Sequence, residues 1–349
     1  MRRRQRWAVL IPSCLLAIAA TCAAQDGLWL EKRDMPEARF GFAIAVVNGR
    51  IYTIGGAADA ELNQLLSTVH EYDPIRDRWT RKEDMPTERF GLAASVVAGK
   101  IYAIGGWDGN ALATVEEYDP ATNRWTTKAD LPEARYTLSA IAVSGKVYAI
   151  AGRVHDDPGA AAGQGPPGAV FEYDPEADTW TEKTAGHSGH WLATSVVDQM
   201  VYVFGGTHFF HEQGLAPVSV YDPAADTWTG RKRMAKPMIT ATSTLDRTIF
   251  VVGGWSHWDD QEKGQGFLTQ VFKYDPPTET WTEVAELPTP RRPATAVVNG
   301  RIYAIGGTKV WPPDPLGTVE EYTPEGWIPR AVSPGGKLTV AWGRIKAER

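Results

Sequence analysis

The chain contains very little cysteine. Of its 349 residues only Cys14 and Cys22 are cysteines, and both lie in an N-terminal segment that we expect to be removed. A mature domain without cysteine has no disulfide, even in an oxidising compartment. Its stability must therefore come from the packing of its core.

The sequence also has no excess of basic residues. It carries 36 lysines and arginines against 42 acidic residues, a net charge of −6, and loss of four N-terminal arginines would lower that charge to −10. Binding to a nucleic-acid backbone depends on clustered positive charge. We therefore expect no nucleic-acid partner.

After the first 24 residues no apolar run is long enough to span a bilayer. The N-terminal run from Trp7 to Ala20 is shorter than a membrane-spanning helix and is typical of a secretory signal. Arginines precede it at positions Arg2, Arg3, Arg4 and Arg6. We expect cleavage after Ala24 and export to the periplasm or the extracellular space. The alternative is a lipoprotein anchored through Cys22, although Thr21 fits a lipoprotein signal poorly.

The sequence does contain a repeat. Six pairs of small residues recur at intervals of 46 to 54 residues: Gly55-Gly56, Gly105-Gly106, Ala151-Gly152, Gly205-Gly206, Gly253-Gly254 and Gly306-Gly307. Each pair is followed by a Tyr-Asp-Pro or Tyr-Thr-Pro triplet that starts at Tyr72, Tyr118, Tyr173, Tyr221, Tyr274 or Tyr322. A tryptophan closes each unit: Trp79, Trp125, Trp180, Trp228, Trp281 and Trp327. Six copies in a fixed order predict a repeat architecture.

This pattern resembles the Kelch repeat, which has a period of about 50 residues, over nearly all of residues 29–331. The resemblance implies an all-β fold, a six-bladed β-propeller with four antiparallel strands per blade. We then expect a signal peptide at 1–24, the propeller at 25–336 and a C-terminal strand or tail at 337–349. The expected repeats are about 35–83, 85–129, 131–183, 187–232, 234–284 and 287–331.

Local signals agree with the resemblance. The apolar segments Gly41–Val47 and Ile51–Ile54 are joined by Asn48-Gly49, a strong two-residue hairpin signal. Trp29 matches the strand at Trp79 although no full repeat precedes it. This surplus strand could replace or flank the last strand of the sixth blade and so tie the two ends of the chain together.

Four repeats carry an arginine just before their first strand: Arg39, Arg89, Arg135 and Arg291. One interpretation is structural, with each guanidinium bonded to backbone carbonyls near the axis. The other is a partial ring of guanidinium groups at the channel mouth, suited to a carboxylate or an acidic peptide.

The connections that follow the glycine pairs vary most in length, and such loops on a rigid scaffold often carry binding residues. Candidate residues on the rim formed by these connections and by the segments before the first strands are Trp107, His155, His190, Trp191, Trp255, His257, Trp258 and Trp311. Aromatic rings beside polar groups suit a sugar or peptide groove. The alternative is that these rings only pack the loops in place.

Two His-x-x-His pairs fall on the fourth repeat, at His187 and His190 and at His208 and His211. Because the first two strands of a blade are neighbours, we hypothesise a zinc or other transition-metal site formed by these four imidazoles. The alternative is four ordinary rim residues and no cofactor.

No Gly-x-Ser-x-Gly motif, phosphate-binding glycine loop or helical zinc-protease motif is present. We therefore expect a monomeric, non-catalytic binding module for a glycan, an acidic ligand or a protein. One alternative is a structural component of the cell envelope. Another is an enzyme that resembles the periplasmic Kelch class that interconverts sialic acid anomers, with roles open to Arg39, Arg89, Glu212 or His190. Copper radical oxidases share the propeller, but their cofactor resembles a tyrosine cross-linked to cysteine, which the mature chain lacks.

Overall fold

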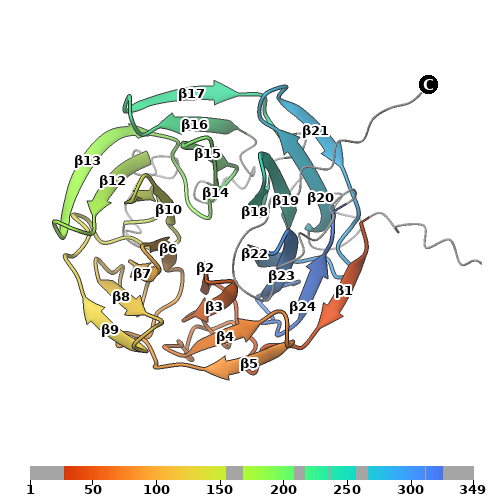
Figure 1. The fold of residues 1–349 in the computed structure, drawn as a ribbon, viewed down its shortest axis with the longest axis horizontal. Coiled ribbons are helices and arrows are strands. Elements are labelled where there is room, and N and C mark those ends of the chain that lie inside the picture. Colours follow the sequence, from red (N-terminus) through yellow and green to blue (C-terminus); the bar gives the residue numbers. More distant parts are fainter. Residues whose placement is uncertain are drawn as a thin grey trace, which may run out of the picture.

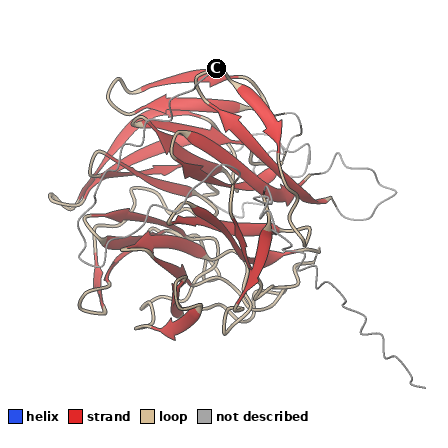
Figure 2. Cartoon of the chain, turned by 45° about the vertical axis from the view of Figure 1, so that its right-hand side comes forward, coloured by secondary structure: helices blue, strands red, loops and turns tan. Residues whose placement is uncertain are grey.

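The computed structural model describes residues 27–154, 168–207, 217–234, 236, 238–256, 266–310 and 312–324. These residues form six four-stranded antiparallel sheets around a central axis (Figure 1) and contain no helix. The expected all-β, six-bladed propeller is confirmed. Figure 2 shows the strands of successive blades stacked face to face around the ring.

Each blade runs from an innermost strand at the channel to an outermost strand at the circumference (Figure 1). The innermost strands are β2 (Ala43–Val47), β6 (Ala93–Val97), β10 (Ser139–Val143), β14 (Ala193–Val197), β18 (Ile239–Leu245) and β22 (Arg292–Val298). The second strands are β3 (Arg50–Ile54), β7 (Lys100–Ile104), β11 (Lys146–Ile150), β15 (Met200–Phe204), β19 (Thr248–Trp255) and β23 (Arg301–Thr308). The third strands are β4 (Val69–Asp73), β8 (Val115–Asp119), β12 (Gly168–Asp174), β16 (Val218–Asp222), β20 (Phe267–Asp275) and β24 (Val319–Tyr322). The outermost strands are β5 (Arg78–Arg81), β9 (Arg124–Thr127), β13 (Thr179–Gly186), β17 (Thr227–Arg231), β21 (Thr280–Glu283) and β1 (Trp29–Lys32). We number the blades 1 to 6 in the order of these lists.

The hairpins between the first two strands follow from their turn residues. Asn48 and Gly49 both have positive φ, 50° and 71°, as a two-residue type I′ turn requires. The β2–β3 register then pairs Val47 with Arg50 and Ala43 with Ile54. Blades 2, 3, 4 and 6 also have positive φ at both turn residues, whereas the hairpin of blade 5 has it at Asp246 alone.

The hydrophobic core is divided among the seams between neighbouring blades. Each of six buried clusters joins two adjacent blades, as when Tyr52 and Val69 of blade 1 meet Ile101 and Tyr118 of blade 2. The second strands are therefore buried on both faces, which explains their unbroken apolar sequence.

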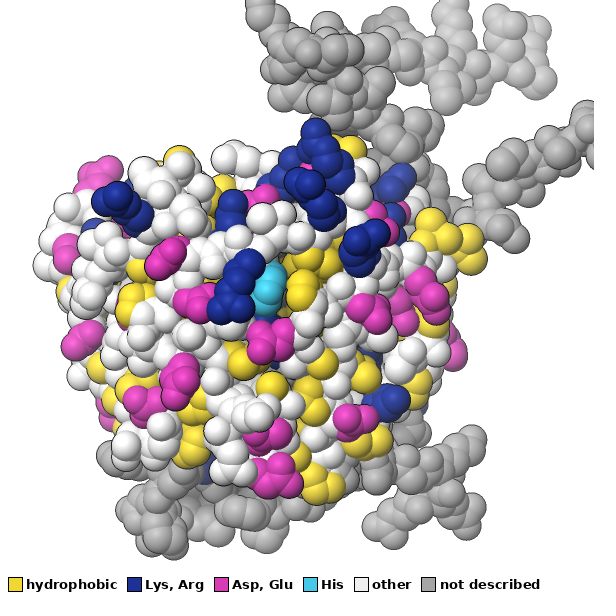
Figure 3. All heavy atoms as spheres, turned by 90° about the horizontal axis from the view of Figure 1, so that it is seen from below, with side chains coloured by type: hydrophobic (Ala, Val, Ile, Leu, Met, Phe, Trp, Pro, Cys, Tyr) yellow, Lys and Arg dark blue, Asp and Glu magenta, His cyan; other side chains and the backbone are white. Residues whose placement is uncertain are grey.

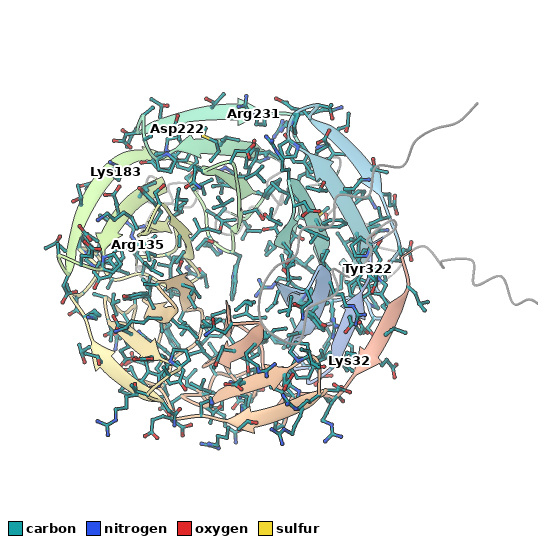
Figure 4. All side chains as sticks on the ribbon, viewed as in Figure 1. Lys32, Arg135, Lys183, Asp222, Arg231 and Tyr322 are labelled. Carbon is teal, nitrogen blue, oxygen red and sulfur yellow. The ribbon has the colours of Figure 1, made fainter. Side chains whose placement is uncertain are left out.

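The ring is closed by the N-terminal strand. Strand β1 pairs with β24 in an antiparallel register, Trp29 opposite Tyr322 and Lys32 opposite Val319, and the rings of Trp29 and Tyr322 lie 5.0 Å apart. The surplus strand at Trp29 thus supplies the outermost strand of blade 6, and Figure 4 shows Lys32 and Tyr322 on these neighbouring strands. Trp327 lies outside the described residues.

The paired glycines allow neighbouring blades to approach closely. Gly55 and Gly56 have φ of 63° and 100°, and a Cβ on Gly55 would lie 2.9 Å from the carbonyl oxygen of Arg89 in the next blade. The amide of Gly56 donates to that same carbonyl at 2.9 Å. Only glycine combines this backbone conformation with this contact.

The surface in Figure 3 mixes acidic and basic side chains without a continuous basic patch on the face shown. None of the described segments is a helix long and apolar enough to cross a membrane.

Candidate functional site at the channel mouth

The four arginines of the repeat lie inside the blades. Their side chains are at most 2% exposed, so they do not form the exposed ring of guanidinium groups that was one of the two expectations. Arg39 donates to the carbonyl oxygens of Gly55 and Thr68 at 3.0 Å each, and Figure 4 places Arg135 within the body of blade 3. Burial without full compensation lowers the pKa of Arg39 to about 10.

Two of these arginines have a buried carboxylate partner. Arg89 contacts Glu116 at 2.7 Å and Arg291 contacts Glu320 at 2.8 Å. Each also donates to a backbone carbonyl of its own blade, that of Gly105 for Arg89 and that of Ala304 for Arg291. Because these donors are directed into the blade, they hold strands together rather than face the channel.

Blades 4 and 5 fill the same place with other side chains. In blade 4, Nε2 of His187 lies 3.0 Å from the Gly205 carbonyl and Nδ1 lies 2.9 Å from Oγ of Ser219. In blade 5, Oγ1 of Thr240 donates to the Gly253 carbonyl at 2.9 Å. The backbone carbonyl at the end of the second strand thus receives a side-chain donor in these blades too.

This placement bears on the hypothesised metal site. With both ring nitrogens hydrogen-bonded, His187 would have to give up Ser219 to bind a metal. His208 and His211 lie outside the described residues, and no group of three potential ligands is found among the residues that are described. The metal site stays a prediction, and His187 is placed as a structural residue.

The position after the arginine that recurs in four repeats lies near the channel mouth and differs from blade to blade. In each blade this residue pairs with the residue that follows the glycine pair. In blades 1 to 6 it is Phe40, Phe90, Tyr136, His190, Ile239 and Arg292. Three aromatic rings are thus followed by a histidine, an isoleucine and an arginine. The repeat changes its chemistry across blades 4 to 6.

Blades 1 to 4 have one further residue at this point that blades 5 and 6 lack. These residues are Gly41, Gly91, Thr137 and Trp191, and their φ values lie between 53° and 64°. Their backbones form an arc of three hydrogen bonds, in which the amides of Gly91, Thr137 and Trp191 each donate to the carbonyl of the equivalent residue in the preceding blade at 2.6 to 2.9 Å. We call this the mouth arc. It stops at Trp191, because β18 and β22 begin directly at Ile239 and Arg292.

Trp191 reaches across the channel. Its ring lies 5.6 Å from that of Phe90 in blade 2 and packs against a cluster that contains Phe40 of blade 1. On its other side, Cζ of Arg292 in blade 6 lies 3.7 Å from the ring centroid. A tryptophan with φ of 57° is a strained conformation. Thr137 has the same left-handed conformation at the equivalent position of blade 3, with φ of 53°.

Arg292 differs from the four arginines inside the blades, because its guanidinium has no acceptor among the described residues. Among the described residues its guanidinium forms no hydrogen bond or ion pair, and it stacks on the ring of Trp191. Desolvation lowers its pKa to about 10 with no opposing carboxylate, so it stays charged at neutral pH. A stacked guanidinium keeps its N–H donors in the ring plane, where they can bind a carboxylate.

A cavity of about 220 Å³ surrounds this pair and continues into the channel. One level below Trp191 its wall is formed by one residue of each innermost strand: Ile44, Ala94, Ala140, Thr194, Thr242 and Thr295. At this level the wall is therefore aliphatic along blades 1 to 3 and hydroxylated along blades 4 to 6, and Ser139 of blade 3 adds a hydroxyl next to Thr194.

The other candidate rim residues are more dispersed. Trp107 is half-buried and pairs with Phe90 in blade 2, while Trp255 ends β19 opposite Ile239. His190 is half-buried beside Trp191 and pairs with Thr207. His155, His257, Trp258, Trp311 and Glu212 lie outside the described residues. Of the expected rim residues, the described structure brings Trp191 to the cavity at the mouth, and His190 precedes it in the chain.

Sequence reasoning missed Arg292. The available signal was the doublet Arg291-Arg292, in which the first arginine fits the repeat and the second replaces the aromatic residue seen at Phe40, Phe90 and Tyr136. Aligning the repeats at this column would have identified it.

Comparisons with known proteins agree with the fold. Residues 27–152 match a family model described as the KLHDC2/KLHL20/DRC7 Kelch-repeats domain. Residues 192–234, 240–288 and 290–327 match the Kelch motif. A search of curated proteins found no match. Among solved structures, the chain resembles one titled "Structure of YjhT", with a TM-score of 0.70 and 15% identity over 84% of this chain and 97% of that one.

The six closed sheets define the chain as a β-propeller. The family models cover both halves of the ring, and the chain belongs to the Kelch-repeat β-propellers. At 15% identity the similarity to YjhT shows the fold alone.

Proposed function

We propose that this chain is an exported, non-catalytic binding module that holds an acidic ligand at the channel mouth. The observation that carries the proposal is Arg292, a desolvated guanidinium stacked on Trp191 without a carboxylate partner among the described residues. Desolvating a cation without a counter-charge costs free energy, and a bound anion would recover it.

The mouth arc adds a second donor. Its first amide, that of Gly41, donates no hydrogen bond within the described residues, and Gly41 lines the same cavity as Arg292. Because the hydrogen bonds of the arc run in one direction, they polarise one another and leave the free amide end more positive. A carboxylate at the mouth would be attracted by both groups.

The test compares two arginines. Thermal shift and isothermal titration calorimetry with small carboxylates would be carried out on the wild type, on Arg292→Gln and on Arg124→Gln, an exposed arginine of β9. We expect binding to the wild type and Arg124→Gln, with a loss of tenfold or more in Arg292→Gln. Equal affinity in all three proteins would contradict the proposal.

Interconversion of sugar anomers at the same mouth is the enzymatic alternative. His190 favours it, because this half-buried imidazole directly precedes Trp191 in the chain and could exchange a proton. Arg39 and Arg89, the other residues considered for the role, are buried in their blades. An NMR exchange experiment on acidic sugars would favour the enzyme if anomer exchange accelerates with wild type and slows with His190→Gln.

A further inference from the structure

The side chains that line the cavity below Trp191 indicate which chemical groups the rest of the ligand has. At this level Thr242 donates its hydroxyl proton to the Thr194 carbonyl at 3.0 Å, and Thr295 donates to the Thr242 carbonyl at 3.0 Å. Each bond crosses from one blade to the preceding one. The proton of each hydroxyl is therefore engaged within the protein, and the oxygen is left with lone pairs for an acceptor role.

The third threonine belongs to the same row. Oγ1 of Thr194 lies 2.7 Å from Oγ of Ser139 in blade 3. One of these hydroxyls donates to the other, which leaves a single proton for a further partner. The row along blades 3 to 6 thus offers mainly acceptors, and a complementary ligand presents hydroxyl or amine donors.

The opposite side of the cavity is aliphatic. Ile44, Ala94 and Ala140 occupy the same level on blades 1 to 3 and line the same cavity. An apolar wall facing a hydroxylated wall suits a molecule with C–H surface on one side and hydroxyl groups on the other.

Resting on the proposed anion site, we propose that the ligand is a polyhydroxylated carboxylic acid, in which the carboxylate binds Arg292 and the hydroxyl-bearing carbons enter the cavity against Thr242 and Thr295. A cavity of about 220 Å³ lies below the range of roughly 300 to 1,000 Å³ found for drug-sized ligands. One acidic monosaccharide or aldonic acid is the expected size.

The experiment separates the carboxylate from the hydroxyl groups. Galacturonate and gluconate carry both, glutarate carries carboxylates without hydroxyls, and galactose carries hydroxyls without a carboxylate. Calorimetric titrations of the wild type should give galacturonate or gluconate an affinity at least tenfold above those of glutarate and galactose.

The variants assign these contributions to residues. Thr242→Val with Thr295→Val should lower galacturonate or gluconate affinity about tenfold and leave glutarate unchanged. Thr242→Ser with Thr295→Ser keeps both hydroxyls and should restore binding. This pair also controls for loss of the inter-blade hydrogen bonds, which a melting curve of each variant would reveal. Arg292→Gln should weaken every carboxylate.

The outcomes distinguish this inference from the proposed function. If glutarate binds as tightly as galacturonate and gluconate, or if the valine variant retains full affinity for them, the polyhydroxylated ligand is wrong while the anion site stands. If no carboxylate binds in a manner that depends on Arg292, the proposed function itself fails.

Discussion

Arg291 and Arg292 are consecutive residues of blade 6, but one lies in the interior of the blade and the other lies at the mouth of the channel. Arg291 is fully buried, bonded to the Ala304 carbonyl and paired with Glu320 at 2.8 Å. Arg292 is half-buried, stacked on Trp191 and without an acceptor among the described residues. An arginine side chain therefore stabilises the fold at position 291, whereas at position 292 its guanidinium has donors left for the proposed ligand. Its partners, and not its place in a repeat, decide its role.

The same contrast applies to the whole ring. Inside the blades, the repeat places a donor against the carbonyl at the end of the second strand, whether that donor is arginine, histidine or threonine. At the mouth, the mouth arc spans four blades and stops at the fifth. The positions that all repeats share pack the blades, and the candidate site lies where blades 5 and 6 depart from the repeat.

Removing the buried arginine should produce the largest effect on stability. Arg291→Met leaves Glu320 buried without its cation and should lower the free energy of unfolding by about 3 to 5 kcal/mol. Arg292→Met removes a side chain without an ion pair and should cost about 1 kcal/mol or less. Urea denaturation of both variants measures the difference. Similar losses in the two would show that Arg292 is structural as well.

The strand that closes the ring should come next. Trp29→Ala removes the ring that packs on Tyr322 and should lower the free energy of unfolding by roughly 2 to 4 kcal/mol. Leu30, the next residue along β1, is 46% exposed, so Leu30→Ser provides a matched control with an expected change within about 0.5 kcal/mol. An unchanged melting temperature in Trp29→Ala would mean that β1 does not close the ring in solution.

A smaller effect should appear as pH dependence in blade 1. Nδ1 of His70 lies 3.1 Å from Nη2 of Arg39, at the level where blades 2 and 6 carry Glu116 and Glu320. Burial, and then the charge of Arg39, lowers the pKa of His70 to about 4. Below the unfolded value of about 6.5, the unfolded chain binds a proton that the folded chain does not. Stability is therefore lost as pH falls from 6.5 towards 4.

The variant His70→Gln has no such titration. Relative to it, the wild type should lose about 1 to 3 kcal/mol of unfolding free energy between pH 7 and pH 4. Chemical denaturation across this range gives the two profiles, and the difference between them removes the shared titration of carboxylates. Parallel profiles would place His70 in a solvated environment.

The smallest change is expected for an ion pair at the surface. Arg247 contacts Asp198 of the neighbouring blade, but the two side chains are 67% and 52% exposed. Because water screens such a pair, Arg247→Met should change stability by about 0.5 kcal/mol or less. A loss as large as that in Arg291→Met would contradict the view that burial sets the value of these pairs.

Much of the fold could be predicted from sequence because the repeat encodes it locally. The turn at Asn48-Gly49, the glycine pairs and the surplus tryptophan at Trp29 each have one structural meaning, and the structure contains them in that form. The burial of Arg39 was less accessible, since a conserved-looking arginine fits both a backbone-bonding role and a ligand role. Only the positions of the surrounding carbonyls distinguish the two.

The candidate site could not be predicted as a whole. Its geometry depends on Trp191 of blade 4 meeting Phe90 of blade 2 and Arg292 of blade 6 across the channel. Such contacts join residues about 100 apart in the sequence and depend on the closed ring. They also depend on the missing residue in blades 5 and 6, which the repeat pattern does not reveal without a structural alignment.

The closing strand has a consequence for how the protein is made. Trp29 is among the first residues of the propeller to leave the ribosome, yet its partner Tyr322 is nearly 300 residues later. Contacts between such distant residues form late, because closing a long loop costs entropy before the contact repays it. A chain that stops early has no β24 to receive β1, so it cannot complete the ring. Closure of the ring therefore requires a chain that has been synthesised as far as the third strand of blade 6.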